Sequence, residues 1–261
     1  NKILAPRLYT QRYDKNFIEI QDFGNETVFK TLKKKGKNKL SYFNRIIKLL
    51  IQIQSIKHRK VKNFRNQNYI IPKYDKKILI NEANLFCDWY AKNNLSKLRK
   101  KRFCKKFKKI IKELTLKLKL KDNIFVHRDF HVSNLMSVKN QIGLIDSQDA
   151  LIGNKAYDLA SLIDDVRLKT SYSFKEKIFK FYIKKQKYLD IKKFKNDFEI
   201  LSVLRNLKII GIFTRLALRD RKKNYLRFIP YTWQLINMRI DQNRTFIDLK
   251  NLLSQNFKKI K

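Results

Sequence analysis

Three polar residues near the middle of the chain have the types and the spacing needed for phosphoryl transfer. Residues 127–134 read His-Arg-Asp-Phe-His-Val-Ser-Asn, so Asn134 follows Asp129 by five positions, and Asp146 ends a short apolar run at 142–145. A carboxylate followed by an amide at this spacing, with a second carboxylate downstream, is typical of a catalytic loop that orients a hydroxyl group and binds Mg²⁺. The sequence therefore predicts a phosphotransferase.

Each of the three side chains can be given one role. Phosphoryl transfer needs an in-line nucleophile and neutralisation of the spreading negative charge, with little covalent participation by the protein. We expect Asp129 to act as the catalytic base on the acceptor hydroxyl group. Asn134 and Asp146 offer the hard oxygen ligands that Mg²⁺ prefers. Taken singly, Asp and Asn at such positions are also common turn residues.

Two histidines and a third aspartate flank these residues. His127 and His131 are four positions apart, but the segment follows a strand-like run, and Arg128 stands where a zinc protease motif has its general base. We therefore expect a packed His127, and a His131 that is either incidental or lines the substrate pocket. Asp158 opens a predicted helix, where its charge meets the positive end of the helix dipole, and kinase-like folds use such an Asp to hold the catalytic loop.

The composition favours a helical globular protein. The chain has 261 residues, 43% of them hydrophobic, with only 5 Gly and 3 Pro, a balance that favours long helices around a sizeable core. Cys87 and Cys104 are isolated, which indicates a reducing compartment and a cytoplasmic protein. No apolar run approaches the roughly 18 residues of a membrane span, and no secretory signal is visible. Because the sequence starts at Asn1 without Met, we expect a fragment.

The formal charge of +40 raises the alternative of a basic nucleic-acid-binding protein without catalysis. Only 16 of the 62 basic residues are Arg, however, and Arg is the residue favoured for base and bidentate phosphate recognition. A Lys excess spread along the whole chain is more typical of compositional drift. The candidate surface is the helix predicted at 96–119, where Phe103 and Phe107 are more simply core positions than platforms for base stacking.

The elements that must position the site are mostly helices. Short apolar runs at 17–20, 124–126 and 142–145 predict strands, and the last two lead directly into acidic residues, so their ends should bring carboxylates together. Pro230 is expected to break the chain before the last helix. Helices are predicted over 25–36, 40–57, 76–93, 96–119, 159–166, 174–187, 194–219 and 233–238.

The sequence resembles the aminoglycoside phosphotransferase superfamily. The resemblance is carried by residues 126–136, 144–150 and 153–162 and extends from about residue 6 to residue 235. Within the superfamily, residues 84–90 and 207–216 are similar to the bacterial anomeric kinases of N-acetylmuramate and N-acetylglucosamine.

The resemblance implies an α+β, protein-kinase-like fold with a mostly helical C-terminal lobe and a truncated N-terminal β lobe. Residues 1–24 would be the remnant of the nucleotide-binding lobe with the hinge, and 25–261 the helical lobe that carries the catalytic loop and the acceptor site. Gln21, Asp22 and Phe23 would form the hinge whose backbone meets adenine. ATP and Mg²⁺ would serve to phosphorylate the anomeric hydroxyl group of an amino sugar in cell-wall recycling.

Two departures from the family pattern affect these expectations. Ser147 stands where the subgroup has an aromatic residue, and no glycine-rich phosphate-covering loop occurs. We therefore expect this chain alone to bind ATP weakly and turn over poorly. Aminoglycoside, choline or homoserine kinases remain alternatives, because the pocket decides the acceptor. Asp149, a candidate substrate contact, and the pair Asp164 and Asp165 are acids near the motif that an aminoglycoside pocket could use.

Overall fold

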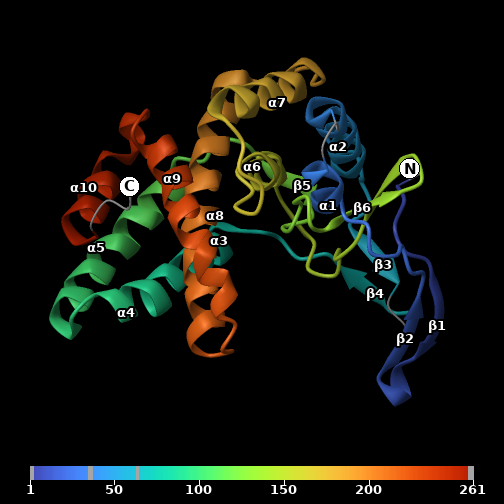
Figure 1. Cartoon of the computed structure of the whole chain (residues 1–261), viewed down its shortest axis with the longest axis horizontal. Helices are drawn as coiled ribbons and strands as arrows, with labels where there is room; N and C mark the ends of the chain where they lie inside the picture. Colours follow the sequence, from blue (N-terminus) through green and yellow to red (C-terminus); the bar gives the residue numbers. More distant parts are fainter. Residues whose placement is uncertain (1–2, 35–37, 63–64, 258–261) are drawn as a thin grey trace. The chain divides into compact units, whose positions relative to one another are not determined.

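The computed structural model describes residues 3–34, 38–62 and 65–257 and divides the chain into two compact units (Figure 1). The mixed unit comprises Asn1–Lys73 and Lys121–Leu189, and the helical unit comprises Tyr74–Leu120 and Asp190–Lys261. None of the helices in the described part of the chain combines the length and apolar character that a membrane span needs.

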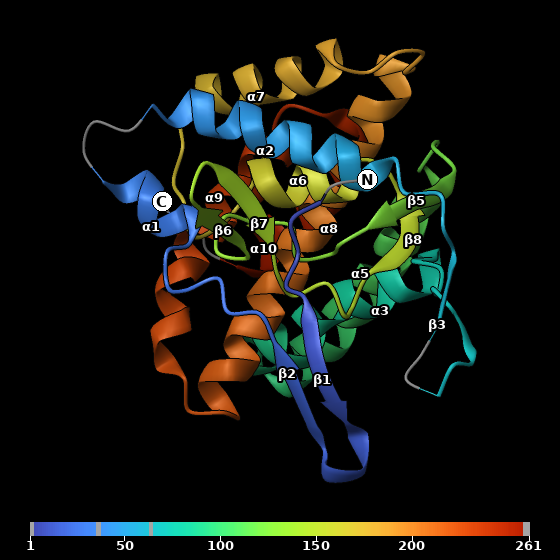
Figure 2. The same ribbon diagram turned by 90° about the vertical axis from the view of Figure 1, so that its right-hand side faces the viewer.

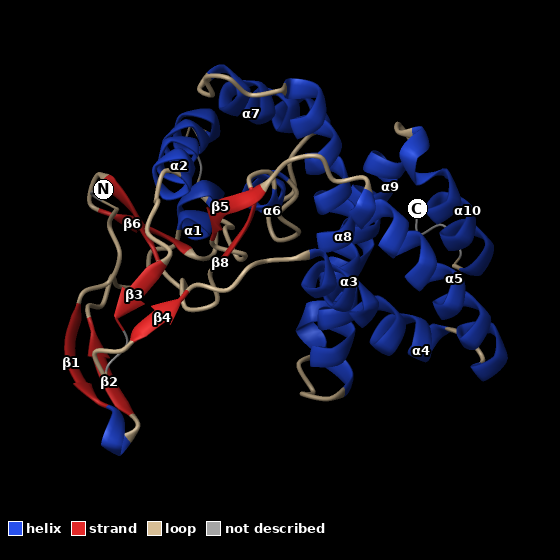
Figure 3. Ribbon diagram, turned by 180° about the vertical axis from the view of Figure 1, so that it is seen from behind, coloured by secondary structure: helices blue, strands red, loops and turns tan. Residues whose placement is uncertain are grey.

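The mixed unit joins short antiparallel strand pairs to helices (Figure 3). In the described residues β1 pairs with β2, β3 with β4, β5 with β8, and β6 with β7. Its strands are β1 (Leu8–Arg12), β2 (Phe17–Ile20), β3 (Lys60–Lys62), β4 (Asn68–Ile70), β5 (Asp122–Val126), β6 (Leu135–Val138), β7 (Gln141–Leu144) and β8 (Leu151–Asn154). Its helices are η1 (Tyr13–Lys15), α1 (Val28–Lys33), α2 (Lys39–Gln54), α6 (Tyr157–Ile163) and α7 (Tyr172–Lys184).

The three predicted strands are confirmed as β2, β5 and β7. The strands β5 and β7 do not pair with each other. Instead β5 takes β8 as its partner, with Val126 opposite Leu151, and β7 takes β6, with Leu144 opposite Leu135. The end of β5, which leads into the catalytic loop, thus lies beside the start of β8. The end of β7, which leads to Asp146, lies beside the start of β6.

Helix α2 supplies much of the core of the mixed unit. Its apolar stripe at 43, 46, 47 and 50 is buried, as the spacing predicts. The side chain of Asn38 caps the helix by accepting the N–H of Ser41, which satisfies one of the free donors of the first turn. Figure 2 shows α2 running alongside α7, and the rings of Phe43 and Phe174 meet edge to face at 5.1 Å between centroids.

The helix predicted from residue 25 begins later. The side chain of Thr27 accepts the N–H of Lys30 and caps α1, so residues 25–27 lead into the helix instead of belonging to it. The predicted end at Gly36 lies outside the described residues.

The β1–β2 hairpin carries apolar side chains that the other described residues leave about half exposed. These two strands pair only with each other in the described residues. Five large apolar side chains on them are about half exposed: Leu8, Tyr9, Phe17, Ile18 and Ile20.

The helical unit is built on a long central helix. Its elements are α3 (Lys76–Leu85), the π-helix η2 (Phe86–Ala91), α4 (Lys92–Asn94), α5 (Lys97–Leu116), α8 (Ile191–Leu218), η3 (Lys223–Phe228), α9 (Ile229–Ile240), η4 (Arg244–Phe246) and α10 (Ile247–Asn256). The helix predicted at 76–93 is one continuous helical stretch of α3, η2 and α4. Pro230 lies in the first turn of α9, where its missing N–H costs nothing, so it begins that helix.

An aromatic cluster forms the core of the helical unit. Phe103 and Phe107 of α5 are buried and lie 6.0 and 5.5 Å from Phe86 between ring centroids, and Trp233 contacts the same ring at 5.7 Å. The core interpretation of Phe103 and Phe107 is thereby confirmed, and these rings are not available for stacking on nucleic-acid bases.

Candidate active site

The β6–β7 hairpin brings the two predicted metal ligands together. Asn134 directly precedes β6 and Asp146 follows β7 by two residues, so antiparallel pairing puts both at the open end of the hairpin. The N–H of Ile145 donates to the carbonyl oxygen of Asn134 at 3.2 Å and closes that end. As a result, Nδ2 of Asn134 donates to Oδ2 of Asp146 at 3.3 Å.

The loop from His127 to Asn134 folds back on its own backbone. The carbonyl oxygen of Asp129 accepts the N–H of His131 at 3.0 Å and Nδ2 of Asn134 at 3.2 Å. The N–H of Asn134 in turn donates to the carbonyl oxygen of His131 at 2.9 Å. The predicted base and the two predicted metal ligands therefore belong to one hydrogen-bonded assembly.

Asp158 fixes the start of this loop. Its carboxylate, only 1% exposed, accepts the N–H groups of His127 at 2.7 Å and Arg128 at 3.0 Å. Charge-assisted bonds of this kind are among the stronger hydrogen bonds in proteins. Arg128 has a φ of 73°, a left-handed conformation that costs a non-glycine residue on the order of 1–3 kcal/mol. The carboxylate of Asp158 thus holds the residue before Asp129 in an otherwise unfavourable conformation.

His127 connects the loop to the segment that carries Asp146. Its Nε2 lies 3.0 Å from the carbonyl oxygen of Ile145, which only accepts, so Nε2 is the protonated nitrogen. Burial lowers the pKa of His127, while the bond to Ile145 and the charges of Asp129 and Asp146 oppose that shift. Its Nδ1 is buried and meets no hydrogen-bond donor among the described residues. His127 is thus held as a neutral ring.

Asp146 stands in a strained conformation on the surface. Its φ is 66°, again left-handed, and its side chain is exposed. Oδ1 of Asp146 accepts Nε2 of Gln148 at 3.4 Å, which leaves the carboxylate largely open to solvent. A non-glycine residue in this region, next to a carbonyl held by His127, is typical of positions under functional constraint.

The donor set fits Mg²⁺ better than zinc. Among the described residues no group of three or more His, Cys, Asp and Glu side chains could hold a metal ion. The pair formed by Asp146 and Asn134 offers oxygen ligands, and the amide oxygen of Asn134 takes part in no hydrogen bond of the described part. Two protein oxygens with phosphate and water completing the shell is the usual binding mode of Mg²⁺ in phosphoryl-transfer sites.

The predicted hinge residues form a turn after β2. The N–H of Gln21 is already used by the carbonyl oxygen of Arg7 at 2.8 Å, and Oδ1 of Asp22 accepts the N–H of Gly24 at 2.7 Å. Gly24 has a φ of 73°, which glycine adopts without cost. In the described residues the backbone groups of Asp22 and Phe23 make no hydrogen bond, so they remain available to a ligand.

Phe23 rests on the β6–β7 hairpin. A Cβ atom added to Gly143 would lie 2.8 Å from the Phe23 ring, closer than carbon atoms approach. The absence of a side chain at Gly143 therefore lets the ring lie against the backbone of β7. This contact joins the hinge to the hairpin that carries Asn134 and Asp146.

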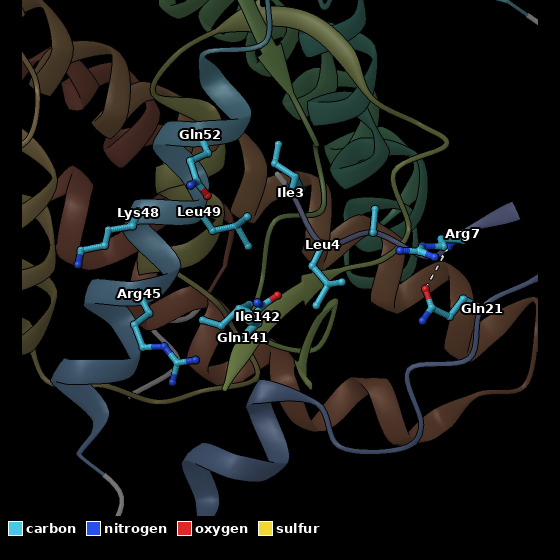
Figure 4. Close-up of a pocket in the computed structure, with 11 residues that line it drawn as sticks. Ile3, Leu4, Arg7, Gln21, Arg45, Lys48, Leu49, Gln52, Gln141 and Ile142 are labelled. Carbon is cyan, nitrogen blue, oxygen red and sulfur yellow. Dashed lines mark hydrogen bonds between the residues drawn. The ribbon is translucent and has the colours of Figure 1, made fainter. Parts of the chain in front are cut away.

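A cavity of about 630 Å³ is lined by Gln141 and Ile142 of the same hairpin, together with residues of the N-terminal segment and of α2 (Figure 4). Its apolar lining includes Leu4, Leu49 and Ile142, and Arg7 and Gln21 contribute polar groups. Asp129, Asn134 and Asp146 do not line it. The cavity is therefore separate from the catalytic loop and touches the hinge only through Gln21.

His131 and Asp149, the predicted substrate contacts, lie in different surroundings. His131 is buried in the turn of the catalytic loop, with 5% of its surface exposed. Asp149 is exposed, and its carbonyl oxygen accepts Nη1 of Arg128 at 3.1 Å. Of these two residues, only Asp149 has a side chain that a ligand can reach from solvent.

Sequence reasoning missed two residues that hold the loop from its far side. The N–H of Val132 donates to Oδ2 of Asp165 at 3.3 Å, and its carbonyl oxygen accepts the N–H of Phe29 at 3.0 Å. Asp164 is buried and pairs with Nζ of Lys175 at 3.2 Å. Asp164 and Asp165 are thus committed to the interior and cannot face a polycationic aminoglycoside. The two adjacent acids near the end of the helix predicted over 159–166 were the available signal, but the sequence did not show that they are buried.

A carboxylate-bearing loop after β5, joined to an Asn and an Asp at the open end of one hairpin, defines a phosphotransferase with a kinase-like fold. The chain belongs to the phosphotransferase enzyme family, whose model matches residues 27–190, and hence to the aminoglycoside phosphotransferase superfamily that its motifs resemble. It is a kinase with an alcohol group as the acceptor.

Similar proteins support this assignment. An N-acetylmuramate/N-acetylglucosamine kinase of Pseudomonas aeruginosa is 28% identical over 96% of this chain and 72% of its own length. A kinase of the same name from Neisseria meningitidis is 27% identical over 87% of this chain and 67% of its own length. The structure of an ADP-bound aminoglycoside phosphotransferase superposes with a TM-score of 0.56 at 16% identity, covering 91% of this chain and 77% of that one.

Proposed function

We propose that this protein transfers the γ-phosphoryl group of ATP, with Mg²⁺, to the anomeric hydroxyl group of N-acetylmuramate or N-acetylglucosamine. The observation that carries the phosphotransfer is the 3.3 Å contact between Asn134 and Asp146, in one hydrogen-bonded assembly with the loop of Asp129. The choice of acceptor is supported by two relatives that are named N-acetylmuramate/N-acetylglucosamine kinase and match most of this chain.

The residues of the loop divide the chemistry. Asp129 accepts a hydrogen bond from the sugar hydroxyl group, aims its oxygen at the γ-phosphorus and takes its proton as the new P–O bond forms, while the bond from the γ-phosphorus to the ADP oxygen breaks and ADP leaves. Asp146 and Asn134 would hold Mg²⁺ through a carboxylate and an amide oxygen. When bound, the ion supplies charge neutralisation at the phosphate oxygens. Asp158 holds the start of the catalytic loop, and His127 holds the carbonyl group next to Asp146, so both fix the relative positions of these groups.

The nucleotide is placed by the hinge. The backbone N–H and C=O groups of Asp22 and Phe23 have no partner in the described residues, so they can pair with the edge of adenine. Phe23 lies on Gly143 and thereby fixes the distance between the hinge and the metal-binding hairpin. Gln21 anchors the turn to Arg7 and does not offer its own N–H to the base.

We place the reaction in the cytoplasm, in the recovery of cell-wall sugars. ATP, the phosphoryl donor, is found in the cytoplasm. The product, an anomeric sugar phosphate, is charged and therefore stays in that compartment. Cys87 and Cys104 contact each other and yet are both free thiols, which fits a reducing compartment.

An acceptor screen tests the proposal. ATP consumption is measured with N-acetylmuramate, N-acetylglucosamine, an aminoglycoside, choline and homoserine, using wild type, Asp129→Asn and the exposed-surface control Asp248→Asn. We expect slow consumption with the amino sugars, in keeping with the poor turnover expected of this chain alone, a loss of about 100- to 10,000-fold in Asp129→Asn, and no change in Asp248→Asn. Phosphorus NMR of the product should show phosphate coupled to the anomeric proton.

Other outcomes distinguish the rivals. Consumption with choline, homoserine or an aminoglycoside alone would keep the phosphotransferase and overturn the amino sugar. Equal consumption by wild type and Asp129→Asn would overturn the catalytic assignment. Nucleic-acid binding through α5 should disappear with added salt, because it rests on counterion release, and sequence-specific binding that survives salt would favour the non-catalytic alternative.

A further inference from the structure

The peptide groups on either side of Val132 are held from two directions. Val132 lies between Asp129 and Asn134 and is fully buried. Its N–H donates to Oδ2 of Asp165 at 3.3 Å, and its carbonyl oxygen accepts the N–H of Phe29, in α1, at 3.0 Å. The second half of the catalytic loop therefore has two anchors outside the loop.

Asp165 is itself held in one orientation. Its other oxygen, Oδ1, accepts the N–H of Arg167 at 2.9 Å and lies 3.7 Å from Nη1 of that residue. The carboxylate is only 1% exposed. A buried carboxylate that accepts from two backbone N–H groups and faces a guanidinium cannot easily turn away.

Asp158 and Asp165 act on different halves of the loop. Asp158 binds the N–H groups of His127 and Arg128, before the predicted base, whereas Asp165 binds the N–H of Val132, after it. The N–H of Asn134 donates to the carbonyl oxygen of His131, the residue directly before Val132. The position of Asn134 thus depends on the half of the loop that Asp165 holds.

We propose that Asp165 is a positioning residue for the metal ligand Asn134. This inference rests on the proposed function, because it takes Asn134 as a ligand of Mg²⁺. Without the carboxylate, the buried N–H of Val132 loses its acceptor and this half of the loop gains freedom. Asn134 then spends less time with its amide oxygen facing the ion. Loss of a partner behind a ligand typically weakens metal binding by about 10- to 100-fold.

The test measures the Mg²⁺ dependence of nucleotide binding. Binding of a non-hydrolysable ATP analogue is followed against Mg²⁺ concentration in wild type, Asp165→Ala and Asp165→Asn. We expect the Mg²⁺ concentration at half-saturation to rise by about 10- to 100-fold in Asp165→Ala, and by less in Asp165→Asn, whose remaining oxygen can still accept the N–H of Val132. Amide hydrogen exchange over 128–136 should increase in the same order.

A matched control exists in the helical unit. Asp197 is also a fully buried carboxylate that accepts backbone N–H groups, those of Lys119 and Leu120 at 2.8 Å each. Asp197→Asn should lower stability and leave the Mg²⁺ requirement unchanged. An equal rise in the Mg²⁺ requirement in Asp197→Asn would assign the effect of Asp165 to general destabilisation and overturn the proposal.

The remaining outcomes are also decisive. The proposal is overturned if Asp165→Ala folds and shows the Mg²⁺ dependence of wild type and unchanged amide exchange over 128–136. If Asp165→Ala does not fold, the same two measurements on Asp165→Asn decide. If wild type binds no nucleotide at any Mg²⁺ concentration, the proposed function fails. In that case, amide exchange over 128–136 that is faster in Asp165→Asn than in wild type would show that Asp165 still anchors the loop.

Discussion

Asn134 and Asp146 are separated by twelve positions in the chain, yet Nδ2 of one lies 3.3 Å from Oδ2 of the other. The β6–β7 hairpin is the cause, because an antiparallel turn returns the chain to its starting point. The meeting of an amide and a carboxylate at the open end of a hairpin leads to the first prediction.

Removing the charge of Asp146 should abolish metal-assisted turnover. Asp146→Asn keeps the shape of the side chain but loses the ligand charge, which is worth several kcal/mol of transition-state stabilisation. We expect kcat to fall by at least about 100-fold, with the melting temperature little changed because the side chain is exposed. Asp241→Asn, on the surface of the helical unit, serves as the control. A variant with wild-type kcat at limiting Mg²⁺ would contradict the assignment.

Replacing Asp158 should affect stability as well as activity. In Asp158→Ala two N–H groups, the buried one of His127 and the partly buried one of Arg128, lose their acceptor, at a cost of up to about 1–3 kcal/mol each. Urea unfolding should show a clearly larger loss than Asp190→Ala, which removes the exposed cap of α8 and costs about 1 kcal/mol. Equal losses in the two variants would mean that Asp158 does not hold the loop.

The buried His127 predicts acid sensitivity. Because its pKa in the folded protein is below the ordinary value of 6.5, the unfolded chain binds more protons than the folded one below about that pH. Its contribution to the free energy of unfolding is therefore complete above pH 6.5 and decreases as the pH falls toward the lowered pKa. His127→Gln should flatten the pH dependence of unfolding between neutral and mildly acidic pH. Unchanged slopes in wild type and variant would refute this origin.

Two glycines should respond differently to alanine. In Gly211→Ala the new Cβ would meet the backbone carbonyl group of Leu85 at 2.4 Å, and backbone cannot give way easily. We expect a loss of about 1–3 kcal/mol or more in unfolding free energy. In Gly143→Ala the new Cβ meets the ring of Phe23, so the ring is displaced and nucleotide affinity falls more than stability does. Calorimetric titration with ATP and thermal unfolding of both variants distinguish the two effects.

The sequence was sufficient for the fold class, the family and most helices, but not for the way the candidate site is held together. Asp129, Asn134 and Asp146 could be recognised from residue type and spacing, and the helical stripe at 43–50 is buried as its period predicts. Strand β6, four residues that directly follow the motif, was not predicted, so the pairing of β6 with β7 was not foreseen.

The anchors of the loop could not be predicted for a different physical reason. Asp165 reaches Val132 across 33 positions, and such contacts depend on tertiary packing that no local pattern encodes. The contact of Phe23 with Gly143 is of the same kind: a glycine within a strand indicates a close approach, but not its partner.

The half-exposed apolar residues of the β1–β2 hairpin have a consequence for handling the protein in solution. Unpaired strand edges flanked by apolar side chains favour association between molecules. A formal charge of +40 opposes that association by mutual repulsion, and this repulsion is screened over about 10 Å at 0.1 M salt. Concentrated samples should therefore remain clear in dilute buffer and become turbid as ionic strength rises.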